Sequence, residues 1–269
     1  MVQHPHDAAP RESHPTAFLP PDTDSRQLPA RFFVDAARKM VPIDYASWTR
    51  GHNLFLVGER HCSDIQRQEM TTILRESRPT VLALECLPSS AQSYIDGFLS
   101  GANDGSRIQT YLQARMGENA QSYLNLILYA RDNGISVIGL EAPSRGTLDN
   151  YNPAPTLDSD FTARNEHWAT VIRDYQGQHP DARIAVFAGG SHIYALNSLL
   201  SPSCPPIDIS QLSSTPLQRK FPPPPLPDSG SWELMASWQK IQAGQERFGW
   251  NNTAIRVDGA ITVIRGAIE

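Results

Sequence analysis

The sequence contains few cysteines and no long apolar run. Its three cysteines, an odd number in 269 residues, argue against a disulfide framework and suit a reducing compartment. No stretch approaches the roughly 18 consecutive apolar residues that predict a transmembrane helix. The first residues lack the basic segment and the apolar segment of a secretion signal. These absences predict a cytoplasmic protein that does not span a membrane.

Charge of one sign is not in large excess either. The 23 lysines and arginines and the 28 aspartates and glutamates give a net charge of −5, which offers no electrostatic basis for binding nucleic acid or an anionic membrane. The chain is 40% hydrophobic and 19% charged, as soluble globular proteins are. The expected partner is a small-molecule or peptide substrate. The sequence does not set the oligomeric state.

Proline is concentrated in two segments that are poor in large apolar side chains. Residues 1–30, which also hold several histidines, predict a disordered arm. Residues 201–230 include Pro222–Pro225. Because proline has no backbone N–H, this stretch is not expected to pair as an internal strand or to add much to the core. We predict a surface excursion there, within a single α/β domain that covers residues 31–269.

Four short apolar runs each end in ionisable side chains. Such runs are typical of strands that are buried on both faces. The runs, with the groups that follow them, are 54–57 with Glu59 and His61, 80–84 with Glu85, 135–140 with Glu141, and 183–188 with His192. Because the carboxyl ends of parallel strands meet at one edge of a sheet, these groups are expected to share one pocket.

Helical patterns separate these runs. The expected helices are 63–77, three within 91–133, 157–178 and 193–200. Alternating strands and helices predict an α/β fold with a central, mainly parallel sheet flanked by helices. Residues 91–133 hold more helix than one crossover needs, so we predict a helical cap over the sheet edge after the second strand. Residues 254–257 and 261–264 predict a C-terminal β-hairpin.

Glutamate and histidine at strand ends support three kinds of chemistry. They ligate a divalent ion, act as general acid and base, or hydrogen-bond a polar substrate. A mixed set suits Mn, Fe, Co or Zn, and a metal-bound water would attack a carbonyl. Without a metal, a histidine oriented by a carboxylate would remove the proton directly. The candidate catalytic and metal-binding residues are Glu59, His61, Glu85 and His192.

Further candidates are expected around this set. Arg164, on the helix 157–178, is a candidate catalytic residue that would hold a carboxylate by two-point contact; the alternative is a pair with Asp160, one turn earlier. A cysteine nucleophile at Cys62 or Cys86, with a histidine as its base, stays open. The expected substrate-binding residues are Arg60, Glu141, Asn165 and Ser191.

An ordered set of motifs resembles a known superfamily. The set is Gly58-Glu-Arg-His61, Glu85, Arg164-Asn165 and Gly189-Gly-Ser-His192. It is similar to the superfamily that groups erythromycin esterases, haem-binding ChaN-like lipoproteins, TIKI/TraB proteins and a domain of the Pasteurella-type toxins. The two Gly-x-x-His motifs match the TIKI/TraB form, in which aspartate usually follows the arginine. The resemblance spans about residues 53–193 and the closing hairpin.

The resemblance implies a bacterial protein of mixed α/β fold, with Arg164 supporting a catalytic or metal-binding set. That set is Glu59, His61, Glu85 and His192. Activities in the superfamily include lactone hydrolysis, metal-dependent peptide cleavage and haem binding. The first Glu and His are one residue closer here than in the esterases. Neither the lipoprotein signal of the ChaN-like proteins nor the membrane anchor of many TIKI proteins is expected.

Two classes of function stay open. The first is an enzyme, hydrolase-like or another acid–base catalyst, that acts on the carbonyl of a lactone, ester or amide, or that runs related acyl or cyclisation chemistry in a biosynthetic pathway. The second is a binding protein for haem or another metal ligand, with His61 or His192 as axial ligand; a toxin or effector domain is a further alternative. A Soret band in the absorption spectrum would favour haem binding.

Overall fold

The computed structural model describes most of the chain between residues 40 and 212 and a short C-terminal part. The described residues are 40–41, 43–61, 64–142, 146–151, 158–210, 212, 253–257 and 260–264. The arm predicted at residues 1–30 and most of the proline-rich stretch, from 213 to 230, lie outside them. Among the described helices, none combines the length and the apolar character needed to cross a bilayer.

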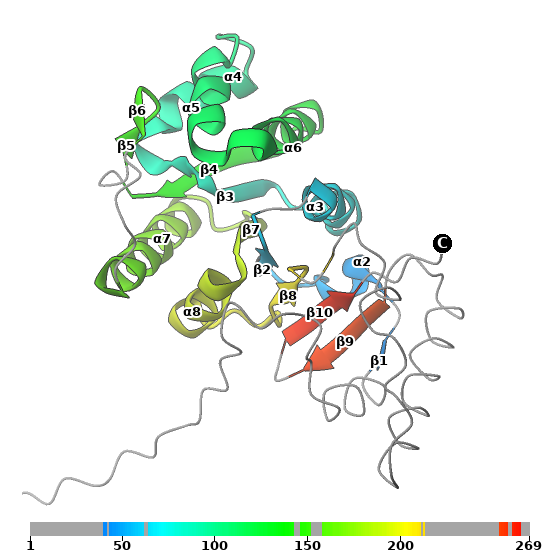
Figure 1. Ribbon diagram of the computed structural model, residues 1–269. Coiled ribbons are helices and arrows are strands. Elements are labelled where there is room, and N and C mark those ends of the chain that lie inside the picture. Colours follow the sequence, from blue (N-terminus) through cyan, green and yellow to red (C-terminus); the bar gives the residue numbers. More distant parts are fainter. Residues whose placement is uncertain are drawn as a thin grey trace, which may run out of the picture.

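A central sheet organises the described part of the chain (Figure 1). Its strand order is β1-β9-β10-β8-β2-β7-β3-β4. From β10 to β4 every neighbouring pair is parallel, whereas β9 runs antiparallel to both β10 and β1. The strands are β1 (Met40–Val41), β2 (Leu54–Glu59), β3 (Val81–Pro88), β4 (Ser136–Glu141), β7 (Ile184–Gly189), β8 (Ile207–Asp208), β9 (Thr253–Val257) and β10 (Ala260–Ile264). The predicted mainly parallel sheet and the C-terminal hairpin are confirmed.

Helices cover both faces of this sheet (Figure 1). On one face lie α3 (Asp64–Ser77), α4 (Gln92–Leu99), α5 (Ser106–Met116) and α6 (Ala120–Asp132), and on the other lie α7 (Asp158–Gln178) and α8 (Gly190–Leu200). The short α2 (Tyr45–Trp48) packs beside α3, and β5 (Gly146–Thr147) pairs with β6 (Asn150–Tyr151). The segment 91–133, expected as a cap, therefore packs against one face of the sheet.

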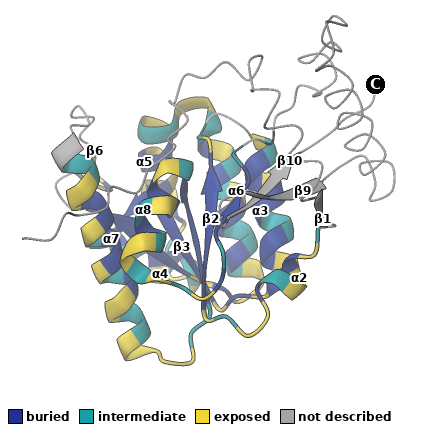
Figure 2. Ribbon diagram, turned by 90° about the horizontal axis from the view of Figure 1, so that it is seen from below, coloured by how far each residue is buried: buried dark blue, intermediate teal, exposed yellow. Residues whose placement is uncertain are grey.

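The strands β2, β3 and β7 are drawn as buried in Figure 2. They are buried because successive side chains enter two different cores. In β2, Phe55 and Val57 pack with α3 to α6, whereas Leu54 and Leu56 pack with α7 and α8. Successive side chains on a strand point to opposite faces, so a strand between two helical layers needs an uninterrupted apolar run. Each such side chain contributes about 1.5–3 kcal/mol when fully buried. This explains why the strands were visible in the sequence.

One expectation about the proline-rich stretch was wrong. Ile207 and Asp208 form β8, an internal strand that pairs in parallel with β2 on one side and β10 on the other. Cys204, Ile207 and Ile209 are fully buried in the core. Pro205 and Pro206 directly precede the two pairing residues, so the positions that lack a backbone N–H lie outside the strand. Proline content over the whole segment concealed a short run without proline.

The start of α8 also differs from its predicted position. The helix begins at Gly190 rather than near residue 193, so His192 lies in its first turn. The close packing of α8 on β2 depends on Gly58, where an added Cβ would lie 3.2 Å from Gly190 Cα and would overlap the Ile193 side chain. A larger residue at position 58 would push the first turn of α8, and with it His192, away from β2.

Candidate functional site

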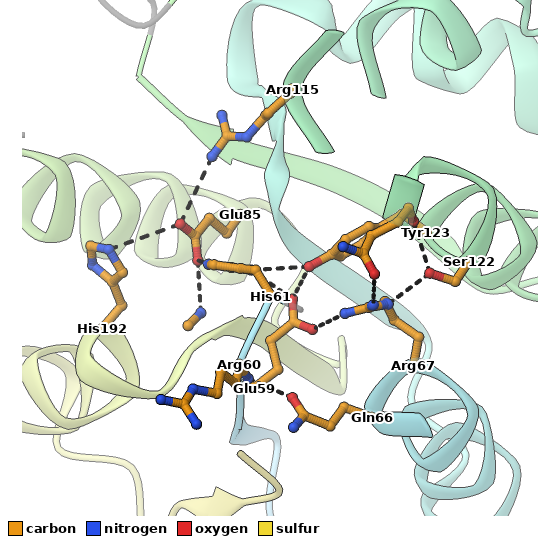
Figure 3. Close-up of polar contacts among 12 residues, drawn as sticks. Glu59, Arg60, His61, Gln66, Arg67, Glu85, Arg115, Ser122, Tyr123 and His192 are labelled. Atoms are coloured by element: carbon orange, nitrogen blue, oxygen red, sulfur yellow. Dashed lines mark hydrogen bonds and ion pairs between the residues drawn. The ribbon is translucent and has the colours of Figure 1, made fainter. Parts of the chain in front are cut away.

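The four residues predicted to form a catalytic set lie together at the C-terminal edge of the sheet (Figure 3). Glu59 ends β2, His61 follows two residues later, Glu85 lies in β3 and His192 lies in α8. A Cβ atom added to Gly189 would lie 3.1 Å from His61 Nε2, 3.5 Å from Glu85 Oε2 and 3.6 Å from His192 Cδ2. Three of the four side chains therefore converge on one glycine. Their roles stay predictions.

Glu59 and Tyr123 hold one nitrogen of His61. His61 Nδ1 lies 3.0 Å from Glu59 Oε1 and 3.0 Å from the Tyr123 hydroxyl oxygen. Tyr123 donates its own proton to the same Glu59 oxygen in a short hydrogen bond. Because an ionised carboxylate only accepts, and the phenol proton is already used, Nδ1 must carry a proton.

A network around Arg67 fixes the other oxygen of Glu59. Arg67 Nη1 donates to Glu59 Oε2 at 2.8 Å, Nε donates to Ser122 Oγ at 2.7 Å, and Nη2 donates to Asn119 Oδ1 at 2.8 Å. The Arg67 residue is only 2% exposed. A buried ion pair is tolerated when its remaining hydrogen-bonding groups are satisfied, as they are here. Glu59 is thus locked against His61.

Glu85 occupies the centre of the site. Its Oε2 accepts the Gly189 backbone N–H at 2.7 Å and lies 3.5 Å from His61 Nε2. Its Oε1 accepts from Arg164 Nη2 at 3.0 Å and lies 3.9 Å from His192 Nε2. Burial alone would raise the pKa of the Glu85 carboxyl, but His61, and then His192 and Arg115, hold that pKa well below its usual range. Glu85 is therefore an anion between two histidines.

Arg164 and Arg115 neutralise Glu141, which is buried. Arg164 Nε donates to Glu141 Oε1 at 3.0 Å and its Nη2 donates to Oε2 at 2.7 Å, which is the two-point contact expected for this arginine. Arg115 Nη2 donates to Glu141 Oε2 at 2.6 Å. Glu141 was predicted to bind substrate; here it is the counter-ion of two arginines, and its role toward a substrate stays a prediction.

The second histidine has a defined tautomer. His192 Nδ1 lies 2.9 Å from Asn165 Oδ1, and Asn165 Nδ2 donates to the Phe161 carbonyl at 2.8 Å. The amide orientation makes Asn165 Oδ1 an acceptor, so Nδ1 carries the proton and Nε2 has the lone pair. Arg164 Nη1 donates toward Nε2 at 3.3 Å. Asn165 was predicted to bind substrate; here it orients His192.

The pKa values of the two histidines are shifted in opposite directions. Burial alone would lower the pKa of His61, but Glu85 and Glu59 raise it to about 10. Burial lowers the pKa of His192 to about 4; Glu85 opposes this shift and Arg164 adds to it. The His61 side chain is 43% exposed, whereas that of His192 is 8% exposed. At neutral pH the solvent-accessible ring is therefore a cation and the buried ring is neutral.

The divalent metal predicted from the sequence is not supported. Among the described residues no group of three or more His, Cys, Asp or Glu side chains is arranged to hold a metal ion. Glu59 and Glu85 already accept hydrogen bonds from Arg67, Tyr123, Arg164 and the Gly189 N–H. A metal ion on His192 Nε2 would also face the Arg164 guanidinium.

The same contacts disfavour an axial haem ligand in this arrangement. Both ring nitrogens of His61 face carboxylates, and His192 is buried between Phe161 and Trp168, whose ring centroids each lie 4.4 Å from its own.

Two cavities, of about 460 and 380 Å³, open near Arg183 and Thr80, at the edge of the sheet opposite to these histidines.

The remaining predicted residues lie around this centre. Arg60 is exposed beside His61, and Ser191 is exposed in the first turn of α8. Cys86 is buried in the core, and burial raises the pKa of its thiol well above the usual range, which disfavours a nucleophilic thiolate. Cys62 lies outside the described residues. The cysteine alternative therefore finds no support at Cys86.

Three contributors to the site were missed: Arg67, Arg115 and Tyr123. Each lies on the inward face of a helix, at helical spacing from apolar neighbours such as Met70 or Leu112. A charged residue on such a face must have a buried partner, and a buried tyrosine hydroxyl also needs one. That signal was available in the sequence, but it does not name the partner.

Residues 47–149 match the model of a family described as haem-binding uptake, Tiki superfamily, ChaN. Over this part of the chain the resemblance to the ChaN-like and TIKI superfamily is confirmed. No curated protein matches the chain significantly.

Several solved structures share weaker similarity. ChaN of Campylobacter jejuni, in a structure titled for cofacial heme binding, is 12% identical, covers 68% of this chain and 94% of its own, and has a TM-score of 0.38. RRSP, a MARTX toxin effector domain from Vibrio vulnificus, is 22% identical and has a TM-score of 0.44; the match covers 62% of this chain and 35% of the RRSP chain. The C-terminal region of Pasteurella multocida toxin is 16% identical and has a TM-score of 0.40; the match covers 55% of this chain and 20% of the toxin chain. The chain thus spans about a third or less of these toxin chains, and similarity at this level says nothing about its activity.

Proposed function

We propose that this site is an acid–base catalytic centre that hydrolyses a carbonyl compound, such as a lactone, ester or amide, without a metal ion. The observation that carries the proposal is the position of Glu85 between a protonated and a neutral histidine. Two titratable groups whose surroundings push their pKa values apart are suited to act as the acid and the base of one reaction.

In this proposal His192 is the base. Its Nε2 lone pair takes a proton from a water molecule, and the resulting hydroxide attacks the substrate carbonyl carbon. The contact from Arg164 Nη1, at 3.3 Å, is long enough to be replaced by that water. Asn165 keeps the tautomer correct by accepting the Nδ1 proton.

His61 is the acid. Its exposed imidazolium donates to the carbonyl oxygen and then gives the Nε2 proton to the leaving oxygen or nitrogen as the acyl bond breaks. One water is consumed, and the products are a carboxylic acid and an alcohol or amine. Glu85, which faces Nε2 of both rings, then passes the proton from His192 back to His61 and resets the site.

The test is hydrolysis of a panel of lactones, 4-nitrophenyl esters and anilides by protein depleted of metal with a chelator. We expect turnover that falls by about 100-fold or more in His61→Gln and in His192→Gln, because each removes one proton-transfer group. His179→Gln, an exposed histidine at the end of α7, is the matched control and should keep full activity. Equal rates in all four proteins would overturn the proposal.

Haem binding is a second candidate, because the matched family is described as haem-binding. Of the two histidines predicted as axial ligands, His61 is the more accessible to solvent, but its ring would have to leave Glu59 or Glu85 to bind the iron. Titration with haemin, followed by absorption, tests it. A saturable Soret shift that is lost in His61→Gln would favour this candidate, and a spectrum identical to that of free haemin would eliminate it.

A further inference from the structure

The buried charges of the site cancel one another. Three carboxylates contact three arginines, with each member's side chain less than 10% exposed. The pairs are Glu59 with Arg67, Glu141 with Arg115 and Arg164, and Glu85 with Arg164. Because six buried groups of opposite sign balance, this interior set leaves no net charge to attract a substrate.

What remains at the accessible side of the site is positive. His61 places Nδ1 3.0 Å from Glu59 and Nε2 3.5 Å from Glu85, so both nitrogens need a proton and the ring is a cation. Next to it, Arg60 is exposed, and within the described residues its guanidinium has no hydrogen bond or ion pair. Glu59 and Glu85 face the His61 cation, whereas the neighbouring Arg60 cation has no anion among the described residues.

The backbone of Arg60 is held firmly, although its guanidinium has no partner within the part of the chain that the structure describes. Its N–H donates to Gln66 Oε1, and Gln66 Nε2 donates to the carbonyl oxygens of Ser210 and Leu212. Figure 3 shows the Arg60 guanidinium extending away from Gln66, on the side of His192. An anchored backbone with a free charged end suits recognition of a ligand.

Two further carboxylates on neighbouring elements do not fill this role. Asp64 Oδ1 accepts from Arg67 Nη2 at 3.2 Å, and Asp208 accepts the Ser210 backbone N–H at 2.9 Å and lies 3.3 Å from the Tyr194 hydroxyl. Both have partners other than Arg60. Among the described residues, no carboxylate therefore pairs with the Arg60 guanidinium, and its charge is available to a ligand.

We propose that the substrate carries an oxyanion, a carboxylate or a phosphate, beside its reacting carbonyl, and that Arg60 binds this group. The inference rests on the proposed hydrolytic function and adds the substrate class. A planar guanidinium holds either oxyanion through two parallel N–H···O bonds. Because His61 is the next residue in the chain, we expect the reacting carbonyl to lie close to the bound oxyanion.

A matched pair of esters tests the proposal. Mono-4-nitrophenyl adipate and 4-nitrophenyl hexanoate have the same leaving group and chain length and differ in a terminal carboxylate or methyl. We expect kcat/KM to be about tenfold higher for the adipate, which corresponds to about 1.4 kcal/mol. Arg60→Gln should reduce this preference to about one, and Arg60→Lys should restore part of it. Arg50→Gln, an arginine at the opposite sheet edge, should leave the preference unchanged.

A binding measurement separates this inference from the proposed function. In NMR spectra, adding adipate should shift the ring resonances of His61 in wild-type protein, and Arg60→Gln should abolish this shift. If both esters are hydrolysed equally and adipate does not shift His61, the oxyanion site is wrong while the hydrolase stands. If adipate shifts His61 but neither ester turns over, the oxyanion site stands and the hydrolytic function, as tested with esters, fails.

Discussion

His61 and His192 face opposite oxygens of the same carboxylate. Glu85 Oε2 lies 3.5 Å from His61 Nε2, and Glu85 Oε1 lies 3.9 Å from His192 Nε2. The two rings nevertheless differ in charge, because His61 has a second carboxylate at Nδ1, whereas His192 has a neutral amide there and an arginine near Nε2. A shared anion with different outer partners thus produces an acid and a base on the two oxygens of one carboxylate.

The first prediction concerns pH. Activity needs neutral His192 and protonated His61, so kcat/KM should rise as the pH passes about 4 and fall as it passes about 10. Glu85→Gln removes an anion beside His61 and should move the alkaline limb to lower pH. Rates measured from pH 3 to pH 11 on one substrate test both statements. An alkaline limb at the same pH in Glu85→Gln would contradict the assignment of that limb to His61.

The second prediction concerns acid stability. The pKa of His192 in the folded protein, about 4, lies below the value of about 6.5 for an unfolded histidine, so the unfolded chain binds the extra proton first. This site therefore contributes stability above about pH 6.5 that is lost as the pH falls toward 4. Urea unfolding at pH 7 and pH 5 should show a smaller difference in His192→Gln than in wild type. An equal difference in both proteins would show that His192 does not cause the loss of stability in acid.

The third prediction concerns the buried arginine. Arg164→Gln leaves Glu85 and Glu141 short of a partner in a dry site, so the free energy of unfolding should fall by about 3–5 kcal/mol. Arg107→Gln breaks the exposed pair with Asp149, where we expect about 0–1 kcal/mol. Chemical denaturation of the three proteins measures both effects. Similar losses in the two variants would mean that the Arg164 network is not the buried, coupled unit described above.

The fourth prediction concerns Tyr123. Tyr123→Phe removes the hydroxyl that donates to Glu59 and accepts from His61, which should cost about 1–2 kcal/mol and lower kcat by about tenfold through misplacement of His61. Tyr129→Phe, on the same helix, is the control, since its hydroxyl has no hydrogen bond among the described residues. Loss of kcat in the control to the same extent would point to a general effect on α6.

The fifth prediction concerns Gly189. A methyl group there would lie 3.1 Å from His61 Nε2 and close to Glu85 and His192, so Gly189→Ala should reduce activity on the order of 100-fold by shifting the catalytic groups. Gly177→Ala, in α7, meets open space and should leave activity unchanged while stabilising the helix by up to about 1 kcal/mol. Full activity in Gly189→Ala would show that the three side chains do not need their present positions.

The site residues that follow strands could be expected at this edge from the sequence, as could Arg164 on α7, whereas those on α3, α5 and α6 could not. Glu59, Glu85 and His192 follow apolar runs, and parallel strands bring such positions together whatever the details of packing. Arg67 and Tyr123 reach the same edge from α3 and α6, and their positions depend on how those helices pack on the sheet. Sequence periodicity shows that such residues face inward, but not what they meet.

The same limit explains why the arginine partners of Glu141 were not predicted. Glu141 lies near the end of a strand as Glu85 does, but both Arg115 and Arg164 pair with it. The local sequence around a carboxylate does not show how many arginines from other elements will contact it. The metal hypothesis had the same origin, because a Glu/His set binds a metal only where arginines do not already occupy its oxygens. β8 was missed because composition was averaged over a segment in which the pairing residues are only Ile207 and Asp208.

The most direct test of the central claim is a measurement of proton positions on the two rings. In ¹⁵N-labelled protein at pH 7, we expect His61 to have protons on both Nδ1 and Nε2 and His192 to have a proton on Nδ1 alone. His61→Gln and His192→Gln assign the two sets of ring resonances. A neutral His61 at pH 7, or a His192 protonated on Nε2, would contradict the acid–base pair on which the proposed function depends.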